Sequence, residues 1–169
     1  WNKRKEEFIS IFEKYKSPNE NNWDCIIPVS GGKDSTYQVY KILKLGYNPL
    51  CIVSTTCHLS DIGKKNIDSL KNLGVDMIEF TANKKIRKIL NKVGMETIGD
   101  ISWPEHISIF TVPVIFAVKF NIKLIIWGEN SQNEYGGPAS KDTENNCLDR
   151  DWLENFGGLI GLRQSDIVD

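Results

Sequence analysis

The sequence has little of what metal clusters, disulfide scaffolds and membrane proteins need. It contains only 4 cysteines and 2 histidines in 169 residues. The cysteines, at Cys25, Cys51, Cys57 and Cys147, show no C-x-x-C spacing, so no zinc site is expected. No stretch resembles a signal peptide or a membrane span. We therefore expect a reduced, cytoplasmic protein without membrane association, in which Cys25 and Cys51 act as small core residues.

Net charge is also nearly absent. The 21 basic and 22 acidic residues give a formal charge of -1. The chain therefore lacks the net positive charge typical of nucleic-acid-binding proteins, and a nucleic-acid partner is not expected. The charges are nevertheless uneven, because acids predominate from residue 129 onward. A basic stretch lies between residues 64 and 92, and it is either a solvated helix face or a patch for an anionic ligand or RNA. Its basic residues are Lys64, Lys65, Lys71, Lys84, Lys85, Arg87, Lys88 and Lys92.

The length is that of one compact domain with a buried core, and it is too short for two full catalytic domains. Apolar residues recur at helical spacing over residues 8–15, before Ser17-Pro18. We expect an N-terminal helix and linker over residues 1–22, packed on the outside of a domain over residues 23–169. The sequence starts at Trp1 without an initiator Met, so we expect a piece of a longer protein.

Short apolar runs alternate with helical patterns along the rest of the chain. This alternation predicts an α/β fold with an open, mainly parallel sheet and helices on both faces. Pro28 falls where the first strand stops pairing, Gly46 and Gly74 end two helices, and Pro113 marks a kink or a helix start. The predicted strands are residues 25–29, 50–53, 75–80 and 122–127, and the predicted helices are residues 34–45, 62–73, 84–93 and 107–120.

Two polar loops follow predicted strands, where ligands bind in open parallel sheets. The first loop, residues 30–36, reads Ser30-Gly31-Gly32-Lys33-Asp34-Ser35-Thr36. Its adjacent glycines can expose consecutive N–H groups at a helix N-terminus, which favours phosphate, while the hydroxyls and Lys33 add donors. Asp34 either caps the helix or helps to hold a bridging Mg²⁺. A βα turn capped by Asp34, without a ligand, is the alternative for the whole loop.

The second loop, residues 128–138, follows the strand predicted to end at Trp127, a residue that we expect in the core. Gly128 allows close approach of the backbone to a nucleotide. Glu129 and Asn130 could hold Mg²⁺, orient the α-phosphate or pair with substrate. A helix N-cap with solvent-facing acids is the alternative for these two residues.

The first loop is not a Walker A motif, because Asp34 follows Gly32-Lys33. It resembles the S-G-G-x-D-S loop of the PP-loop ATP pyrophosphatases, a superfamily that includes GMP synthetase, NAD synthetase, asparagine synthetase and tRNA-thiolating enzymes. The resemblance implies the adenine nucleotide alpha-hydrolase type of fold. It also implies a reaction in which a substrate oxygen attacks the α-phosphate of ATP, pyrophosphate leaves, and a nucleophile such as ammonia displaces AMP.

Further stretches narrow the resemblance. Together with the two loops, Gly63-Lys64-Lys65-Asn66, Trp103-Pro104 and Leu148-Asp149-Arg150 resemble the N-acetyl sugar amidotransferase family, over nearly the whole chain. The resemblance implies an ATP-dependent transferase or ligase that converts an acetamido group into an acetamidino group. Its products would be bacterial surface glycans, such as lipopolysaccharide or flagellin glycans.

The same resemblance implies the site residues and partners. Pyrophosphate and ATP would contact Val29, residues 30–36 and Gly128, and Mg²⁺ would be held by Asp34 and Glu129. The substrate would be an N-acetyl sugar, expected in a nucleotide-linked form, and a separate glutaminase subunit would supply ammonia. Relatives usually carry a zinc-ribbon-like segment before this core, which the sequence does not contain. The implied catalytic residues are Lys33, Asp34, Glu129 and Asn130, and the implied sugar-binding residues are Glu134, Tyr135, Gly136 and Gly137.

Several alternatives stay open from the sequence. His106 is either a general acid or base or a surface or capping histidine, with the second favoured, and His58 ranks lower. Residues 135–137 could equally form an ordinary glycine turn. The chain could instead be a tRNA-modifying member of the superfamily, or a regulatory module that binds ATP without catalysis.

Overall fold

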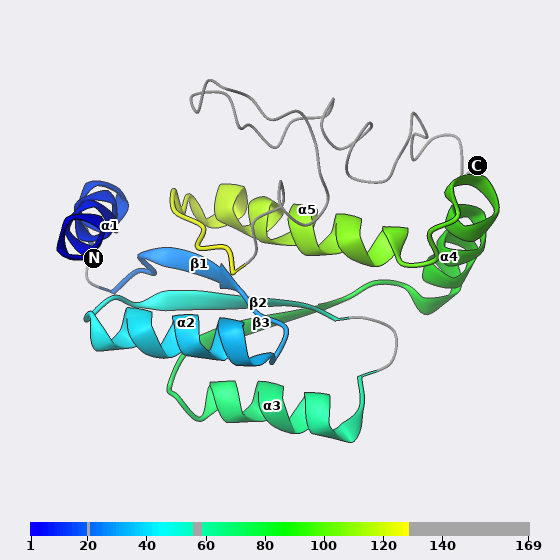
Figure 1. Cartoon of the computed structure of the whole chain (residues 1–169), viewed down its shortest axis with the longest axis horizontal. Coiled ribbons are helices and arrows are strands. Elements are labelled where there is room, and N and C mark those ends of the chain that lie inside the picture. Colours follow the sequence, from blue (N-terminus) through cyan, green and yellow to red (C-terminus); the bar gives the residue numbers. More distant parts are fainter. Residues whose placement is uncertain (20, 56–58, 129–169) are drawn as a thin grey trace. The chain divides into compact units, whose positions relative to one another are not determined.

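A computed structural model of the protein describes residues 1–19, 21–55 and 59–128. The chain divides into two compact units. The first unit contains Trp1–Thr81 and Thr111–Gly128, and Ala82–Phe110 is the described part of the second. In chain order the elements are α1 (Asn2–Tyr15), β1 (Cys25–Pro28), α2 (Lys33–Lys44), β2 (Pro49–Thr55), α3 (Asp61–Lys71), β3 (Asp76–Thr81), α4 (Lys84–Ile98) and α5 (Trp103–Phe120) (Figure 1).

The first unit is built on a parallel sheet with the strand order β1-β2-β3. Ile26 of β1 is in register with Leu50 of β2, and Ile52 of β2 is in register with Ile78 of β3. Each strand is joined to the next through a helix, as parallel pairing requires. The α/β class and the open parallel sheet predicted from the sequence are therefore confirmed.

The prediction of a fourth strand over residues 122–127 is wrong in its extent. The segment pairs with β1 through one parallel bridge, Ile26 to Ile125. Ile26 N–H donates to the Leu124 carbonyl at 2.9 Å, and Ile126 N–H donates to the Ile26 carbonyl at 2.8 Å. Hydrogen bonding alternates between the two edges of a strand, so the next donor toward this segment would be Pro28, which has no N–H. The ladder stops there, as Pro28 predicted for β1.

This segment has a consequence for the topology of the first unit. β2 occupies one edge of β1, so residues 122–127 lie along the other edge. The chain first adds β2 and β3 on one side of β1. It then returns and places residues 122–127 on the opposite side of β1, so the direction of strand order reverses at β1. Such a reversal is the place where open α/β sheets bind ligands, at the carboxyl ends of the strands.

Alternate residues of β1 belong to two different cores, as expected for a sheet buried on both faces. Cys25, Ile27 and Val29 pack with residues of α2 and α3. Ile26 packs instead with Leu50 and Ile52 of β2 and with residues 112, 117 and 122. Helices therefore cover both faces of the sheet, with α2 and α3 on the same face (Figure 1).

The N-terminal helix exists as predicted, and it contributes to the core of the first unit. Phe12 is completely buried in the cluster that contains Cys25 and Ile27. Its ring stacks on that of Tyr47, with 4.3 Å between the centroids. Ile11 and Tyr15, on other faces of α1, remain exposed.

Glycines end the helices of the first unit where the sequence placed them. Gly46 and Gly74 follow α2 and α3 with φ of 84° and 83°, the left-handed conformation that terminates helices. Of the two alternatives predicted for Pro113, the helix start is wrong, because α5 begins at Trp103 and Pro113 lies inside it. Pro113 is therefore not a helix start.

The second unit contains α4 and the beginning of α5. The predicted end of α4 at residue 93 is wrong, because the helix continues to Ile98 and stops at Gly99, whose φ is 74°. Close packing explains why a glycine stands at position 94 inside α4, because a Cβ there would lie 2.6 Å from the Asp100 carbonyl oxygen. Arg87, buried in this unit, pairs with Glu105 at 3.0 Å.

Among the described residues, no single helix combines the length and apolar composition needed to cross a membrane. The pair α4 and α5 meets that test only when taken together, across a bend of 118°.

Candidate functional site

The first loop is held against α3 by its first glycine. Gly31 is buried and has a φ of 77°, in the region that strongly favours glycine. A Cβ at this position would lie 3.2 Å from the Asn66 Cβ and 3.2 Å from the Ile67 Cγ1. Both backbone conformation and space therefore require glycine, and the loop packs against the middle of α3.

The hydroxyl groups of the first loop bond mainly within it. Ser30 Oγ accepts a hydrogen bond from Gly32 N–H at 3.3 Å. The Ser35 and Thr36 hydroxyls both donate to the Gly32 carbonyl, at 3.2 and 2.8 Å. The sequence suggested these three hydroxyls as donors to phosphate. In the structure they set the shape of the loop, and Ser30 is the exposed one of the three serine and threonine residues.

The N-terminus of α2 has no side-chain cap. Gly32 is the N-cap residue, and the first bond of the helix runs from Thr36 N–H to the Gly32 carbonyl at 3.1 Å. No described residue offers an acceptor to the N–H groups of Lys33, Asp34 and Ser35. The capping role considered for Asp34 is thus not seen. Three free donors and the positive end of a helix dipole suit an anion.

Charged side chains accompany these donors. Lys33 and Asp34 are both exposed, and neither forms an ion pair within the described part of the chain. A pocket of about 590 Å³ adjoins the loop and is lined by Gly31, Lys33 and Thr36 on the loop side. Asn66 and Ser69 of α3 line its other side. Tyr37, Tyr40 and Leu73 complete the lining, so the pocket beside the loop is open and combines polar groups with a largely apolar surface.

The second loop begins beside α2. Gln38 Nε2 donates a hydrogen bond to the Trp127 carbonyl at 2.9 Å, and Gly128 follows directly. The structure thus brings Gly128 to the same helix that starts in the first loop. Trp127, expected in the core, is half-buried. The remaining residues proposed for this loop lie outside the described residues: Glu129, Asn130, Glu134, Tyr135, Gly136 and Gly137.

Sequence reasoning missed Gln38. Its amide lies midway along α2, a helix whose buried residues include Val39 and Ile42. The only signal for it was a polar side chain with hydrogen-bonding capacity on a helix that follows a phosphate-type loop. Its partner could not be known without the return of residues 122–127 to the edge of β1.

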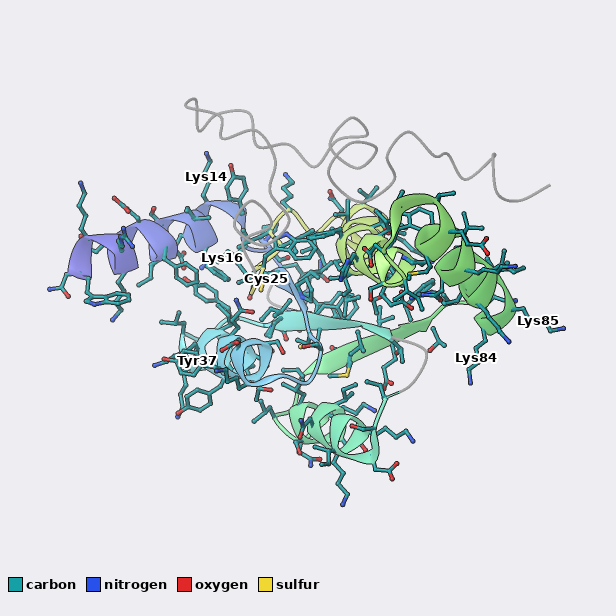
Figure 2. The ribbon with its side chains drawn as sticks, turned by 45° about the vertical axis from the view of Figure 1, so that its right-hand side comes forward. Lys14, Lys16, Cys25, Tyr37, Lys84 and Lys85 are labelled. Atoms are coloured by element: carbon teal, nitrogen blue, oxygen red, sulfur yellow. The ribbon has the colours of Figure 1, made fainter. Side chains whose placement is uncertain are left out.

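The cysteines of β1 and β2 are structural. Cys25 and Cys51 are free, completely buried neighbours in the sheet, as predicted, and Cys25 is marked in Figure 2. Burial raises the pKa of each thiol to about 12, so neither is a nucleophile at neutral pH. Cys57 and Cys147 lie outside the described residues. Within the described part of the chain, no three His, Cys, Asp or Glu side chains gather as a metal site would need.

The basic stretch is partly neutralised by acids. Lys64 pairs with Asp61, Lys71 pairs with Asp68 and Glu79, and Lys92 lies 3.7 Å from Glu96. The guanidinium of Arg87 is buried against Glu105. By contrast, Lys84 and Lys85 extend away from the start of α4 (Figure 2). These local pairs favour the solvated-face interpretation for much of the stretch.

His106 is the histidine that lies among the described residues. His106 belongs to the second unit, where its Nδ1 lies 3.7 Å from Asp100 Oδ2 and its backbone N–H donates to the Ser102 carbonyl in the first turn of α5. Its side chain is half-buried, and the choice between a general acid or base and a surface or capping histidine stays a prediction. His58 lies outside the described residues.

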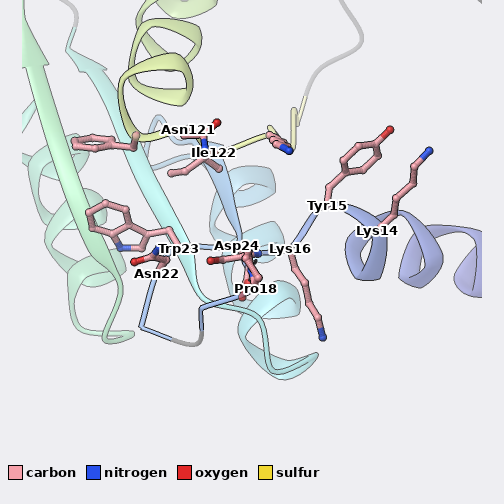
Figure 3. Close-up of a pocket in the computed structure, with 12 residues that line it drawn as sticks. Lys14, Tyr15, Lys16, Pro18, Asn22, Trp23, Asp24, Asn121 and Ile122 are labelled. Atoms are coloured by element: carbon pink, nitrogen blue, oxygen red, sulfur yellow. Dashed lines mark hydrogen bonds between the residues drawn. The ribbon is translucent and has the colours of Figure 1, made fainter.

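A second pocket of about 630 Å³ lies at the amino ends of β1 and of segment 122–127 (Figure 3). Lys14 and Lys16 both line it, but they extend in different directions (Figure 3). Asp24, also in the lining, is engaged by the N–H groups of Ser17 and Asn48. The charged side chains of this pocket therefore do not point toward one place.

Comparison with protein-family models and with curated proteins gives no match for this chain.

Proposed function

We propose that this protein is an ATP-dependent amidotransferase that forms AMP and pyrophosphate while converting the acetamido group of an N-acetyl sugar into an acetamidino group. One observation carries the proposal: α2 has an uncapped N-terminus with exposed Lys33, and its Gln38 lies beside Gly128 at the reversal of strand order. That arrangement suits a polyphosphate. The choice of an amidotransferase rests on the sequence resemblance of the two loops.

In the proposed reaction the acetamide oxygen attacks the α-phosphorus of ATP, and the bond to the bridging oxygen of pyrophosphate breaks. The free N–H groups of α2 and the Lys33 ammonium would stabilise the charge that develops on the departing β- and γ-phosphates. Ammonia then attacks the activated carbon, and AMP leaves with the former acetamide oxygen. Loss of a proton from the added nitrogen leaves the amidine. The chain's task is largely positioning and charge stabilisation.

The residues present are compatible with Mg²⁺, which binds nucleotide sites through one or two carboxylates and the phosphates rather than through an all-protein cage. Asp34 is exposed at the start of α2, where it can reach such an ion. Asp34 and Glu129 would hold Mg²⁺, and the ion would neutralise phosphate charge. Ammonia would come from a separate glutaminase subunit.

The test is to incubate the full-length protein with ATP, Mg²⁺, ammonia and UDP-N-acetyl sugars. We expect pyrophosphate and AMP, together with a sugar product lighter by about one mass unit, as replacement of O by NH requires. Asp34→Ala and Ser30→Ala should lower product formation at least about 100-fold with the fold intact, because both residues are exposed. Asp61→Ala, an exposed acid at the start of α3, is the matched control and should keep full activity.

Other outcomes would replace the proposal. Unchanged turnover in both loop variants would remove the assignment of the site. Tight, salt-sensitive tRNA binding without sugar turnover would favour a tRNA-modifying enzyme. Binding of ATP with no pyrophosphate released in the presence of any sugar would favour a regulatory module.

A further inference from the structure

One side chain joins the two loops of the candidate site. Gln38 lies on α2, four residues after Asp34, and its Nε2 donates to the Trp127 carbonyl at 2.9 Å. The two residues are 89 positions apart in the sequence. The bond therefore connects the helix that begins in the first loop with the backbone that leads into the second.

The other end of the Gln38 amide is directed at Gly128. Its Oε1 is buried and has no hydrogen-bond partner within the described part of the chain. A Cβ on Gly128 would lie 3.1 Å from that Oε1, a closer contact than side chains normally make. Gly128 does not have a positive φ, unlike Gly31. The need for glycine at this position comes from the neighbouring amide and not from the backbone conformation.

We infer that Gln38 is a positioning residue, which sets the separation between the first loop and Gly128 during adenylyl transfer. The inference rests on the proposed function. In that reaction the β- and γ-phosphates sit at the first loop while the α-phosphate is attacked near the second, so the distance between the loops determines the geometry of attack. A displacement of about 1 Å can cost on the order of 10²-fold in rate.

Segment 122–127 depends on the hydrogen bond from Gln38 because its own pairing with β1 is short. The segment is bonded to β1 only around Ile26, and Pro28 supplies no donor further along. Near its carboxyl end, the Gln38 amide takes the place of the missing ladder bond. Glutamine fits this role because it has the reach and the N–H donor. A carboxylate cannot donate, and it would face the Trp127 carbonyl oxygen in a buried place.

The first measurement is hydrogen exchange of the backbone amides of residues 124–128 in the full-length protein, without nucleotide. Gln38→Met keeps the length of the side chain and removes its donor, and it should speed exchange of these amides at least about tenfold. Lys44→Met, an exposed change on the same helix, is the matched control and should leave exchange unchanged. Gln38→Glu should behave like Gln38→Met at about pH 7.5 and recover protection as the pH falls to about 4, near the ordinary glutamic acid pKa, because the carboxyl then gains a proton that it can donate.

The second measurement separates binding from turnover. Gln38→Met should bind magnesium pyrophosphate within about twofold of the wild type, because the first loop is intact, while product formation falls on the order of 10²-fold. Unchanged exchange in Gln38→Met, or equal losses of pyrophosphate binding and turnover, would overturn the inference. Exchange could respond as expected while the wild type turns over neither sugar nor ATP. The proposed function and the positioning role would then both be wrong, and only the structural role of the hydrogen bond from Gln38 to Trp127 would be supported.

Discussion

The two ends of the sheet in the first unit differ in whether their polar groups have hydrogen-bond partners within the described part of the chain. At the amino ends of the strands, Asp24 accepts hydrogen bonds from Ser17 N–H at 3.2 Å and from Asn48 N–H at 2.8 Å. Trp23 Nε1 donates to Asp76 at the start of β3. At the carboxyl ends, the first N–H groups of α2 find no acceptor among the described residues, and the buried Gln38 Oε1 receives no hydrogen bond from a donor there.

This contrast indicates which end is structural and which end is available to a ligand. Folding normally satisfies buried polar groups, because an unsatisfied one costs about 1–3 kcal/mol. The amino end meets that requirement with its own side chains, and its pocket has lysines that diverge (Figure 3). The carboxyl end leaves donors open around glycines, as a phosphate site requires. Changes at the two ends should therefore affect different properties.

The largest effect is expected from Gly31→Ala at the carboxyl end. The left-handed backbone costs about 1–2 kcal/mol for alanine, and the contact with Asn66 and Ile67 adds roughly as much by overpacking. The free energy of unfolding, measured with urea, should fall by about 2–4 kcal/mol, and pyrophosphate binding should be lost.

Gly46→Ala is the matched control for this change. Gly46 has a φ of 84°, and a Cβ added to it would meet nothing within 4 Å, so only the backbone cost of about 1–2 kcal/mol applies. Pyrophosphate binding should stay intact. Equal losses of stability in the two variants would show that the first loop is not packed against α3 as described.

A smaller effect is expected from Asp24→Ala at the amino end. The change removes the acceptor of two backbone N–H groups, and hydrogen bonds to a charged group contribute about 1.5–3 kcal/mol each when well buried. Because Asp24 is partly exposed, we expect unfolding to become easier by about 2 kcal/mol, with pyrophosphate binding unchanged. Asp61→Ala, at an exposed surface pair, should cost at most about 0.5 kcal/mol. A loss of pyrophosphate affinity in Asp24→Ala would break the distinction between the two ends.

The effect expected in the sheet between the two ends is absent at neutral pH and appears only in alkaline solution. Burial raises the pKa of Cys25 and Cys51 to about 12, so the folded protein keeps these protons at a pH where the unfolded chain has lost them. Stability is therefore full below the ordinary thiol pKa of about 8.5 and falls as pH rises toward 12. Each thiol should contribute a slope on the order of 1 kcal/mol per pH unit. The free energy of unfolding, measured with urea at several pH values between about 9 and 11, should fall less steeply with pH in the double variant Cys25→Ala and Cys51→Ala than in the wild type. Equal dependence on pH in the two proteins would contradict buried thiols.

Much of the fold could be predicted because its signals are local. The apolar run before Gly31 predicted β1, and Gly46 and Gly74 predicted the ends of α2 and α3, since only glycine adopts their left-handed backbone easily. The first loop was found for the same reason, since a strand, two glycines and a helix start are contiguous in the sequence. Its polar composition indicated a site before any contact was known.

The parts that were missed depend on groups far apart in the sequence. Residues 122–127 read as the clearest strand, yet their ladder is limited by Pro28, which lies almost a hundred positions earlier in the chain. Whether Asp34 caps α2 was equally undetermined until the N-cap proved to be Gly32 without a side-chain bond. No local pattern contains that information.

Composition and short-range spacing were enough to establish the class of the fold, the strand-to-helix loop at residues 30–36 and the small-residue character of Cys25 and Cys51. The return of the chain to the free edge of β1, and the tie from Gln38 to Trp127, became visible only in three dimensions. Hydrogen bonds and burial act between neighbours in space. Which distant residues become neighbours is settled when the sheet and its two cores assemble together.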